Sequence, residues 1–152
     1  MDGVKGEWIE GVKVISLRRI LDERGSIMKM ISKDDDYFEG FGECYFSTIN
    51  SNGVVKGWHK HNRMILNYVC ISGSIKLVLY EEKTKKIMEI FIGDENYCLI
   101  QIPPNIWNGF KAIGNQKAII GNFANITHDP EEQERLPADT LEIPYDWGIK
   151  HE

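Results

Sequence analysis

Two histidines separated by a single residue are the clearest candidates for chemistry in this sequence. His59 and His61 lie in a β-like run, and side chains at i and i+2 of a strand point to the same face. If that face lines a cavity, both imidazoles enter it. A neutral imidazole near pH 7 is well matched to general-base chemistry, so the pair predicts proton transfer. The competing interpretation is that both rings are exposed strand residues or hydrogen-bonded core histidines.

Lys56 is a candidate for a charged group beside such a base. It precedes His59 by three residues and leans to the opposite face of a regular strand, but a bulge at Gly57 would redirect it. In the cavity its charge would neutralise a phosphate or a developing oxyanion; otherwise it is a solvated surface lysine. Aromatic side chains would stack on a base or sugar, or else belong to the core; these are Phe46, Trp58, Trp107 and Phe110.

Short β-like runs separated by turn residues must position these side chains. The runs cover residues 12–17, 26–32, 43–49, 53–59, 65–71, 74–82, 85–92, 97–103 and 116–124. Within one of them Ile75, Leu77 and Leu79 share a face, as expected for a strand with one buried side. Strand-length runs at such regular spacing predict an all-β sandwich or barrel. Helical signal is weak and limited to residues 32–38 and 129–136.

Composition indicates one globular domain. The 152 residues are 42% hydrophobic and 27% charged, which is ordinary for a folded domain. We expect a single domain over 1–152, with a core at about 12–126 and an irregular C-terminal extension at about 127–152. A formal charge of -5 without a basic run makes the chain a poor nucleic-acid binder.

The sequence favours a cytoplasmic protein that does not engage a membrane. No apolar stretch approaches the ~20 residues of a membrane span, and the N-terminus lacks the apolar core of a secretory signal. Cys44, Cys70 and Cys98 form no CxxC pair and indicate reduced core thiols.

The spacing around the histidines resembles the first cupin motif, which is a glycine, five residues, HxH, a glutamate and a closing glycine. Gly53, His59, His61 and Gly73 fall at the corresponding positions, whereas Leu66 stands in place of the glutamate. The resemblance implies that the two imidazoles point into a barrel.

Residues 102–110 resemble the second cupin motif, with Asn108 in place of its histidine. Two imidazoles without further comparable ligands make an under-coordinated, weak metal site, so we expect no metal. A metal cupin that uses His59 and His61 with Asn108 and waters stays an alternative.

The order and spacing of motifs resemble dTDP-4-dehydrorhamnose 3,5-epimerase over about residues 12–147. The motifs are Asp22-x-Arg24-Gly25, Gly53 to His59, residues 102–110, Asp129-Pro130, and Leu141 to Trp147. The resemblance implies a cupin jelly roll, a homodimer, a dTDP-4-keto-6-deoxyglucose substrate, and neither a metal nor an organic cofactor.

The same resemblance implies roles for single residues. His59 matches the family's base, Lys56 matches an arginine that contacts the substrate, and Arg24 matches an arginine that contacts the nucleotide phosphates. The family's enolate-stabilising lysine, pocket histidine and catalytic tyrosine are replaced by Leu66, Asn108 and Asn122. The active site is therefore expected to be an altered one.

The sequence also resembles dTDP-4-keto-6-deoxyglucose 3,4-ketoisomerases. The similar segments are Asp22 to Ser26, the HxH strand, and Ile71 to Ser74. That family uses a pair of histidines to shuttle protons and a tyrosine as acid, for which Tyr45 is the nearest candidate.

We therefore predict a sugar-nucleotide epimerase or isomerase that removes a proton beside the keto group of a dTDP-4-keto-6-deoxyhexose. His59 is the expected base, Tyr45 or water the acid, and Lys56 with Asn108 polarises the carbonyl oxygen. The residues expected to bind substrate are Arg24, Ser47, His61, Trp107, Asn108 and Asn122. The alternatives are a 3,4-ketoisomerase and a non-catalytic cupin that binds a sugar nucleotide.

Overall fold

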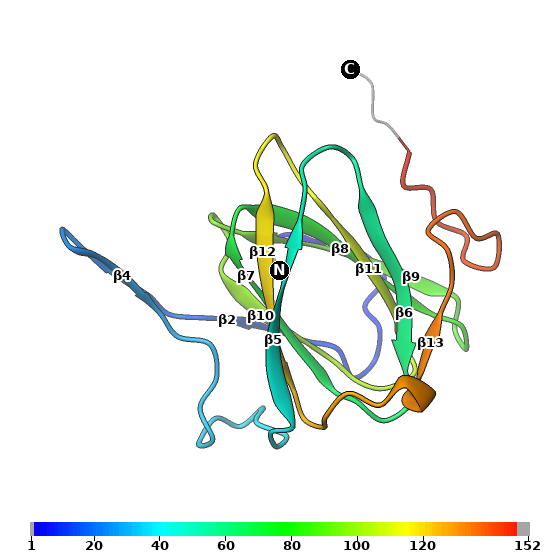
Figure 1. Ribbon diagram of the computed structural model, residues 1–152, viewed down its shortest axis with the longest axis horizontal. Helices are drawn as coiled ribbons and strands as arrows, with labels where there is room; N and C mark the ends of the chain where they lie inside the picture. The colour runs from blue at the N-terminus through cyan, green and yellow to red at the C-terminus, as the bar shows by residue number, and fades with distance from the viewer. Residues whose placement is uncertain (1, 149–152) are drawn as a thin grey trace.

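The computed structural model describes residues 2–148, which form two antiparallel β-sheets facing each other across a barrel (Figure 1). One sheet has the strand order β1-β9-β8-β11-β6-β13 and the other β2-β10-β7-β12-β5. This is the all-β cupin jelly roll that the sequence predicts. The strands of the first sheet are β1 (Val4–Gly6), β6 (Val55–His61), β8 (Ser74–Glu81), β9 (Lys86–Gly93), β11 (Trp107–Ala112) and β13 (Gln133–Arg135). Those of the second are β2 (Lys13–Ser16), β5 (Glu43–Ile49), β7 (Leu66–Ser72), β10 (Cys98–Ile102) and β12 (Ala118–Ala124).

Alternating apolar residues fill the interior of the barrel where β8, β9 and β10 meet. Leu77 of β8 pairs with Ile90 of β9, and both are fully buried, as is Ile100 of β10. Burying such side chains is the main favourable term in folding, at roughly 25 cal/mol per Å² of apolar surface. This apolar half of the barrel forms the hydrophobic core. In the other half, strands β5, β6 and β12 carry polar side chains that point inward.

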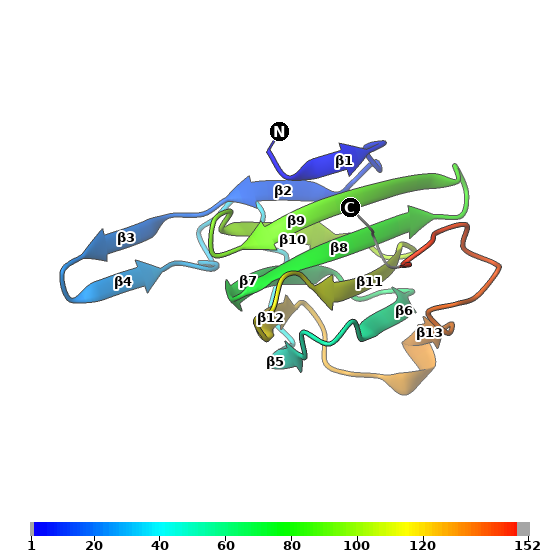
Figure 2. The same cartoon turned by 90° about the horizontal axis from the view of Figure 1, so that it is seen from above.

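A separate hairpin of β3 (Arg19–Asp22) and β4 (Gly25–Met28) projects away from both sheets (Figure 2). Its apolar side chains are largely exposed: Ile20 by 49%, Leu21 by 73% and Ile27 by 69%. The sequence predicts a strand near β4 but does not predict β3.

The segment after β12 departs from the helix expected at residues 129–136. Only a 3-10 turn, η1 (Pro130–Glu132), forms there, capped by the Asp129 side chain, which accepts from the Glu131 amide. The chain then runs as β13 along the free edge of β6, pairing Gln133 with His61 and Arg135 with His59. Because the edge of β6 offers unpaired backbone groups, tertiary pairing overrides the local helical preference.

The structure tests two further expectations about exposure and membranes. Cys70 and Cys98 are buried, as expected of core thiols, but Cys44 is exposed on the edge strand β5, so that expectation is wrong for Cys44. Within residues 2–148, no helix has the length and apolar character needed to cross a membrane. Residues 149–152 of the predicted extension lie outside the described residues.

Candidate active site

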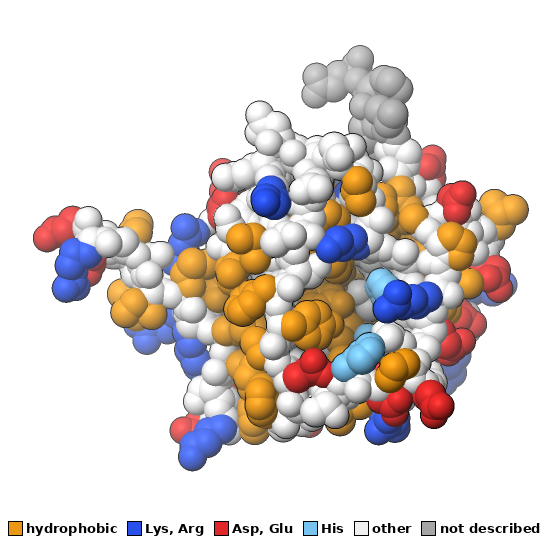
Figure 3. Space-filling view, viewed as in Figure 1, with side chains coloured by type: hydrophobic (Ala, Val, Ile, Leu, Met, Phe, Trp, Pro, Cys, Tyr) orange, Lys and Arg blue, Asp and Glu red, His pale blue; other side chains and the backbone are white. Residues whose placement is uncertain are grey.

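A pocket of about 430 Å³ opens into the barrel between strands β5 and β12 on one side and β6 and β13 on the other. In Figure 3 a hollow appears on this face, with apolar side chains at its base and histidine, cationic and acidic side chains around it. Six of the nine predicted site residues line the pocket: Tyr45, Ser47, Lys56, His59, His61 and Asn122.

An irregularity in β6 brings Lys56 to the same cavity as the histidines. His59 pairs with Asn108 of β11, and Lys56 pairs with Phe110, so three steps along β6 match only two along β11. The extra residue reverses the side-chain alternation, as the bulge expected near Gly57 would do. The Lys56 ammonium then reaches across to β5, where it donates to Ser47 Oγ at 2.9 Å and to the Thr48 carbonyl oxygen at 2.6 Å.

The opposite wall of the pocket places a phenol next to a buried amide. Asn122 Nδ2 donates to the Tyr45 hydroxyl oxygen at 3.0 Å, and Asn122 Oδ1 accepts from the Asn67 amide at 3.0 Å. Hydrogen bonds therefore hold both the Nδ2 and the Oδ1 atom of Asn122 in place. Burial, together with the nearby carboxyl of Glu43, raises the pKa of Tyr45, so its hydroxyl keeps its proton at neutral pH.

The second histidine has a carboxylate partner. His61 Nδ1 is hydrogen-bonded to Glu132 Oε1, and both side chains are buried. Glu132 Oε2 accepts from the backbone amides of Asn62, Arg63 and Met64 at 3.1, 3.1 and 3.2 Å. Burial acts to raise the pKa of Glu132, but the hydrogen bonds from His61 and from the backbone hold that pKa below its usual range.

The first histidine has a different environment. Desolvation lowers the pKa of His59 below its ordinary value, and the positive charge of Arg135 and the neighbouring His61 lower it further. Arg135 is placed beside His59 because β13 pairs with β6 at that position. The His59 ring is therefore neutral at pH 7, the form that accepts a proton.

Asn108 lies behind the pocket rather than at its surface. Its side chain is fully buried, Oδ1 accepts from the Tyr68 hydroxyl at 3.1 Å, and Nδ2 donates to the His59 carbonyl oxygen at 3.1 Å. Both ends of the amide are thus engaged within the protein, and Asn108 is not among the residues that line the pocket, so its direct contact with substrate stays a prediction without geometric support. Asn108 instead joins the buried Tyr68 to the backbone of His59.

Trp107 and Arg24 also lie away from the pocket. Trp107 is buried on the outer face of the sheet, with Trp58 and Ile143, and its indole N–H donates to Glu82. Because neighbouring residues on a strand point to opposite faces, Trp107 cannot share the interior with Phe110, which lines the pocket. Arg24 sits at the turn of the projecting hairpin, exposed and paired with Asp22 at 2.7 Å.

Several pocket residues were not predicted from the sequence: Glu43, Tyr68, His128, Gln133 and Arg135 line the pocket, and Glu132 lies behind it. The place of Glu43 in the pocket could have been predicted from period-two alternation, because it shares a strand face with Tyr45 and Ser47. Glu132 and Arg135 reach the site only because β13 pairs with β6, and no local pattern indicates that pairing.

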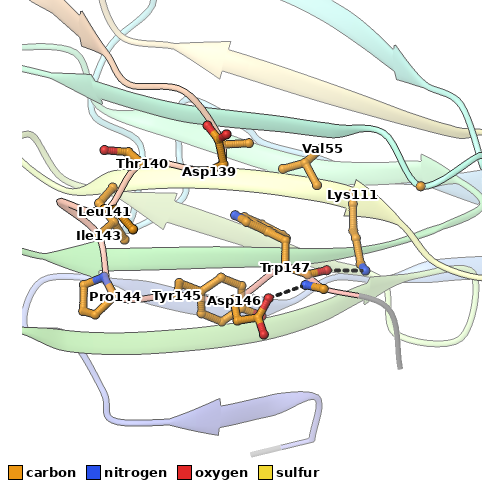
Figure 4. A pocket seen from close by; sticks show the side chains of 13 residues that line it. Val55, Lys111, Asp139, Thr140, Leu141, Ile143, Pro144, Tyr145, Asp146 and Trp147 are labelled. Carbon is orange, nitrogen blue, oxygen red and sulfur yellow. Dashed lines mark hydrogen bonds between the residues drawn. The ribbon is translucent and has the colours of Figure 1, made fainter. Parts of the chain in front are cut away.

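A second, larger groove of about 720 Å³ lies on the outer face of the same sheet, beneath residues 138–148 (Figure 4). The ring of Trp147 occupies the space left by Gly109, where an added Cβ would approach the indole to 3.1 Å. Lys111 Nζ donates to the Trp147 carbonyl oxygen at 3.3 Å. Among the described residues that line this groove, none belongs to the site predicted from the sequence.

Across residues 2–148, no three His, Cys, Asp or Glu side chains are gathered so as to hold a metal ion.

The fold and the pocket define a class of protein: a cupin jelly roll whose pocket is lined by three histidines, two tyrosines, a lysine and an arginine, together with other side chains. Residues 10–140 match the family described as FdtA, WxcM-like, C-terminal, and the chain belongs to that family.

Relatives of this chain are sugar epimerases and isomerases. It is 34% identical over 150 residues to the probable low-salt glycan biosynthesis epimerase Agl13 of Haloferax volcanii, a match that covers 93% of this chain and 96% of that protein. The crystal structure of a dTDP sugar isomerase from Desulfovibrio desulfuricans G20 superposes with a TM-score of 0.87 and 35% identity, covering 91% of this chain and 92% of that one.

A more distant solved structure shows the fold alone. The sugar 3,4-ketoisomerase QdtA from Thermoanaerobacterium thermosaccharolyticum, in complex with TDP, has a TM-score of 0.73 and 20% identity over 90% of this chain and 95% of that one. At the level of family, the resemblance to sugar-nucleotide epimerases and ketoisomerases is confirmed.

Proposed function

We propose that the protein is a sugar-nucleotide epimerase or isomerase that acts on a dTDP-4-keto-6-deoxyhexose by removing a proton beside the keto group, in a reaction related to 3,5-epimerisation. The observation that carries this proposal is the His59 ring, which lines the pocket with a lowered pKa and with the cations Lys56 and Arg135 around it. A neutral base close to positive charge suits a reaction in which negative charge develops on oxygen.

The proposed chemistry begins with His59. It takes the proton from the carbon beside the ketone, and the electron pair of that bond passes onto the carbonyl oxygen as an enolate. The Lys56 ammonium stabilises this oxyanion from a position fixed by Ser47 and Thr48. The Tyr45 hydroxyl, protonated at neutral pH, faces His59 from β5 and returns a proton to carbon.

The same cations suit the nucleotide part of the substrate. Lys56, His59 and Arg135 also line a shallower groove of about 480 Å³ that borders the pocket. Arginine and lysine are the side chains that bind phosphate oxygens. We place the diphosphate along this groove, with the sugar in the deeper pocket.

A 3,4-ketoisomerase is the second candidate, and the paired histidines favour it. His59 and His61 project from one strand, so they serve neighbouring atoms on one face of a sugar ring. Tyr45 lies on the opposing wall, which suits inversion at carbon because epimerisation needs a base and an acid on opposite faces. Because Tyr45 is the candidate acid in both reactions, the product assigns the reaction: inversion at C3 or C5 means epimerisation, and a 3-keto sugar means ketoisomerisation.

The decisive experiment is incubation with dTDP-4-keto-6-deoxyglucose in deuterated water, followed by NMR. Deuterium entering at C3 and C5 means epimerisation, and a 3-keto product means ketoisomerisation. An absence of exchange, or equal exchange in the wild type and in His59→Asn, counts against the proposal. Calorimetric binding of dTDP without any turnover would instead favour a non-catalytic sugar-nucleotide-binding cupin.

We also propose a homodimer that completes the site. The β3-β4 hairpin exposes Ile20, Leu21 and Ile27, and an isolated two-stranded hairpin is marginally stable in water, so a second copy of the chain is a suitable cover. If Arg24 contacts the nucleotide phosphates, as in the resembling family, it must come from the second subunit, because here it lies at the hairpin turn.

Mixing inactive variants tests this arrangement. Arg24→Ala and His59→Asn, each weakened alone, should regain activity when they are unfolded and refolded together, because half of the sites in a mixed dimer then carry both native residues. Sedimentation analysis should give twice the chain mass. A monomer by sedimentation would reject the dimer, and a dimer without complementation would reject the shared site.

A further inference from the structure

The buried pair formed by His61 and Glu132 is distinct from the base assigned above. The two residues are 71 positions apart in the sequence and meet because β13 runs along β6. Glu132 is 4% exposed, and His61 lines the pocket. Across residues 2–148 no hydrogen bond joins a carboxylate to the His59 ring. Of the two histidines, His61 therefore has a carboxylate partner and His59 does not.

The charge state of Glu132 fixes where the proton on His61 resides. Three backbone amides and one ring nitrogen donate to its two oxygens, an arrangement that stabilises the ionised carboxylate. An ionised carboxylate can only accept, so the His61 nitrogen that faces it must carry the hydrogen. In the neutral ring this leaves Nε2 without a proton.

We propose that Glu132 is a positioning residue, which orients His61 and holds it in the tautomer whose Nε2 can take a proton from the substrate. This inference rests on the proposed function and adds a second proton acceptor to the pocket. When His61 takes a proton from the carbon beside the ketone, the electron pair of the C–H bond passes onto oxygen, and the imidazolium is stabilised by the Glu132 carboxylate. Returning that proton to carbon restores the neutral ring.

The first test needs no variant. Nitrogen-15 NMR of the wild-type protein, at a pH where the ring is neutral, should show His61 protonated at Nδ1 and unprotonated at Nε2. A ring protonated at Nε2 would overturn the proposal. Assignment of the His61 signal comes from its disappearance in His61→Asn.

The second test reverses the tautomer. In Glu132→Gln the amide oxygen can keep the backbone contacts while the amide N–H₂ donates to His61 Nδ1, so the ring proton moves to Nε2. The exchange rate at saturating substrate should then fall on the order of 10²-fold with little change in KM. A flipped tautomer with a wild-type rate would overturn the proposal. The matched control is Glu134→Gln on the same strand, where an exposed carboxylate pairs with Lys60 at 3.2 Å.

A double variant separates positioning from a direct role. If Glu132 acts through His61, His61→Asn combined with Glu132→Gln should be no slower than His61→Asn alone, whereas a further loss would mean an independent role and overturn the proposal. Other titratable or charged groups line the same pocket and can also contribute to how the rate of each variant depends on pH. They are His59 on β6, Glu43 and Tyr45 on β5, Tyr68 on β7, His128 before η1, and Arg135 on β13.

The proposed function and the proposed role of Glu132 can be rejected independently of each other. If the wild-type protein exchanges no hydrogen of any 4-keto sugar nucleotide, the proposed function is rejected. The nitrogen-15 spectrum of the wild type and of Glu132→Gln still decides whether Glu132 sets the tautomer of His61, because that measurement uses no substrate.

Discussion

The two faces of strand β6 reverse the usual distribution of polarity in a barrel. Lys56, His59 and His61 point inward to the pocket, where neighbouring strands bury aliphatic side chains. Trp58, between them, points outward yet is only 1% exposed, because Tyr145 and Trp147 of the C-terminal segment cover it. Polar groups placed inside a barrel cost free energy unless they are partnered or hydrated.

This contrast separates two requirements on one strand. The inner face carries the groups that we propose act on a substrate, and each lies beside a specific neighbour: Ser47 for Lys56, Glu132 for His61, and the edge strand β13 for His59. The outer face anchors the strand by apolar packing. We therefore expect inner-face substitutions to change rates and outer-face substitutions to change stability.

The largest effect is expected for His59→Asn. Removing the base should lower the rate of deuterium exchange into the substrate by about 10²- to 10⁴-fold, since a positioned general base contributes that much. The far-ultraviolet circular dichroism spectrum and the urea midpoint should stay near those of the wild type. The neighbouring Lys60→Gln, on the other face of the strand, is the control and should exchange at close to the wild-type rate.

Trp58→Ala should mainly reduce stability. Truncating a buried tryptophan typically costs about 3–5 kcal/mol, and here the ring loses its contacts with Tyr145 and Trp147. Urea unfolding measures the free-energy change. Leu141→Ala, in the same C-terminal segment but 98% exposed, is the control and should change stability by less than about 0.5 kcal/mol. An equal loss in both variants would contradict the buried role of Trp58.

Lys56→Met should raise KM and lower the exchange rate at saturating substrate, each on the order of 10-fold or more, because Lys56 is proposed both to bind phosphate and to stabilise the oxyanion, and hydrogen bonds to charged groups are each worth about 1.5–3 kcal/mol. Steady-state kinetics at two salt concentrations measures this, and the variant should be less sensitive to salt than the wild type. The lysine on the outer side of β11 provides the comparison: Lys111→Met should leave KM unchanged. A similar rise in both variants would mean that general surface charge, rather than the pocket, holds the substrate.

The smallest effect is expected in the dependence of stability on pH. The pKa of His59 is lower in the folded protein than its ordinary value of 6.5, so between those two values the unfolded chain binds more protons. The stabilisation from a neutral, buried His59 is therefore fully present above about pH 6.5 and is lost as pH falls toward the folded pKa. Urea titrations from pH 7.5 downward should show this loss in the wild type and less of it in His59→Asn.

Local spacing was sufficient to predict an all-β sandwich or barrel and to bring several of the pocket residues together, and the family resemblance specified the jelly roll. Period-two alternation and turn residues identify most strands of the two sheets, and the HxH pattern places both histidines on one face. The bulge that turns Lys56 inward was also foreseeable, since Gly57 interrupts the strand.

Other features depend on contacts between distant segments and could not be read locally. Glu132 and Arg135 are placed by β13, in a stretch whose local preference favours a helix. Asn108 occupies the position of a family histidine, but its amide is satisfied by Tyr68 and the His59 backbone, which removes it from the surface. Trp107, by contrast, could have been placed on the outer face from the sequence, because it is the strand neighbour of Asn108, which stands at the histidine position of the second cupin motif.

The packing of residues 143–147 against the back of β6 has a practical consequence for handling the protein. Trp147 rests on Gly109 and against Trp58, directly behind the wall that carries the histidines. Shortening the chain after Leu136, or fusing a bulky reporter close to Trp147, would therefore remove the packing that supports β6 and shift the side chains of the pocket. This holds even though residues 137–147 contribute no side chain to the pocket.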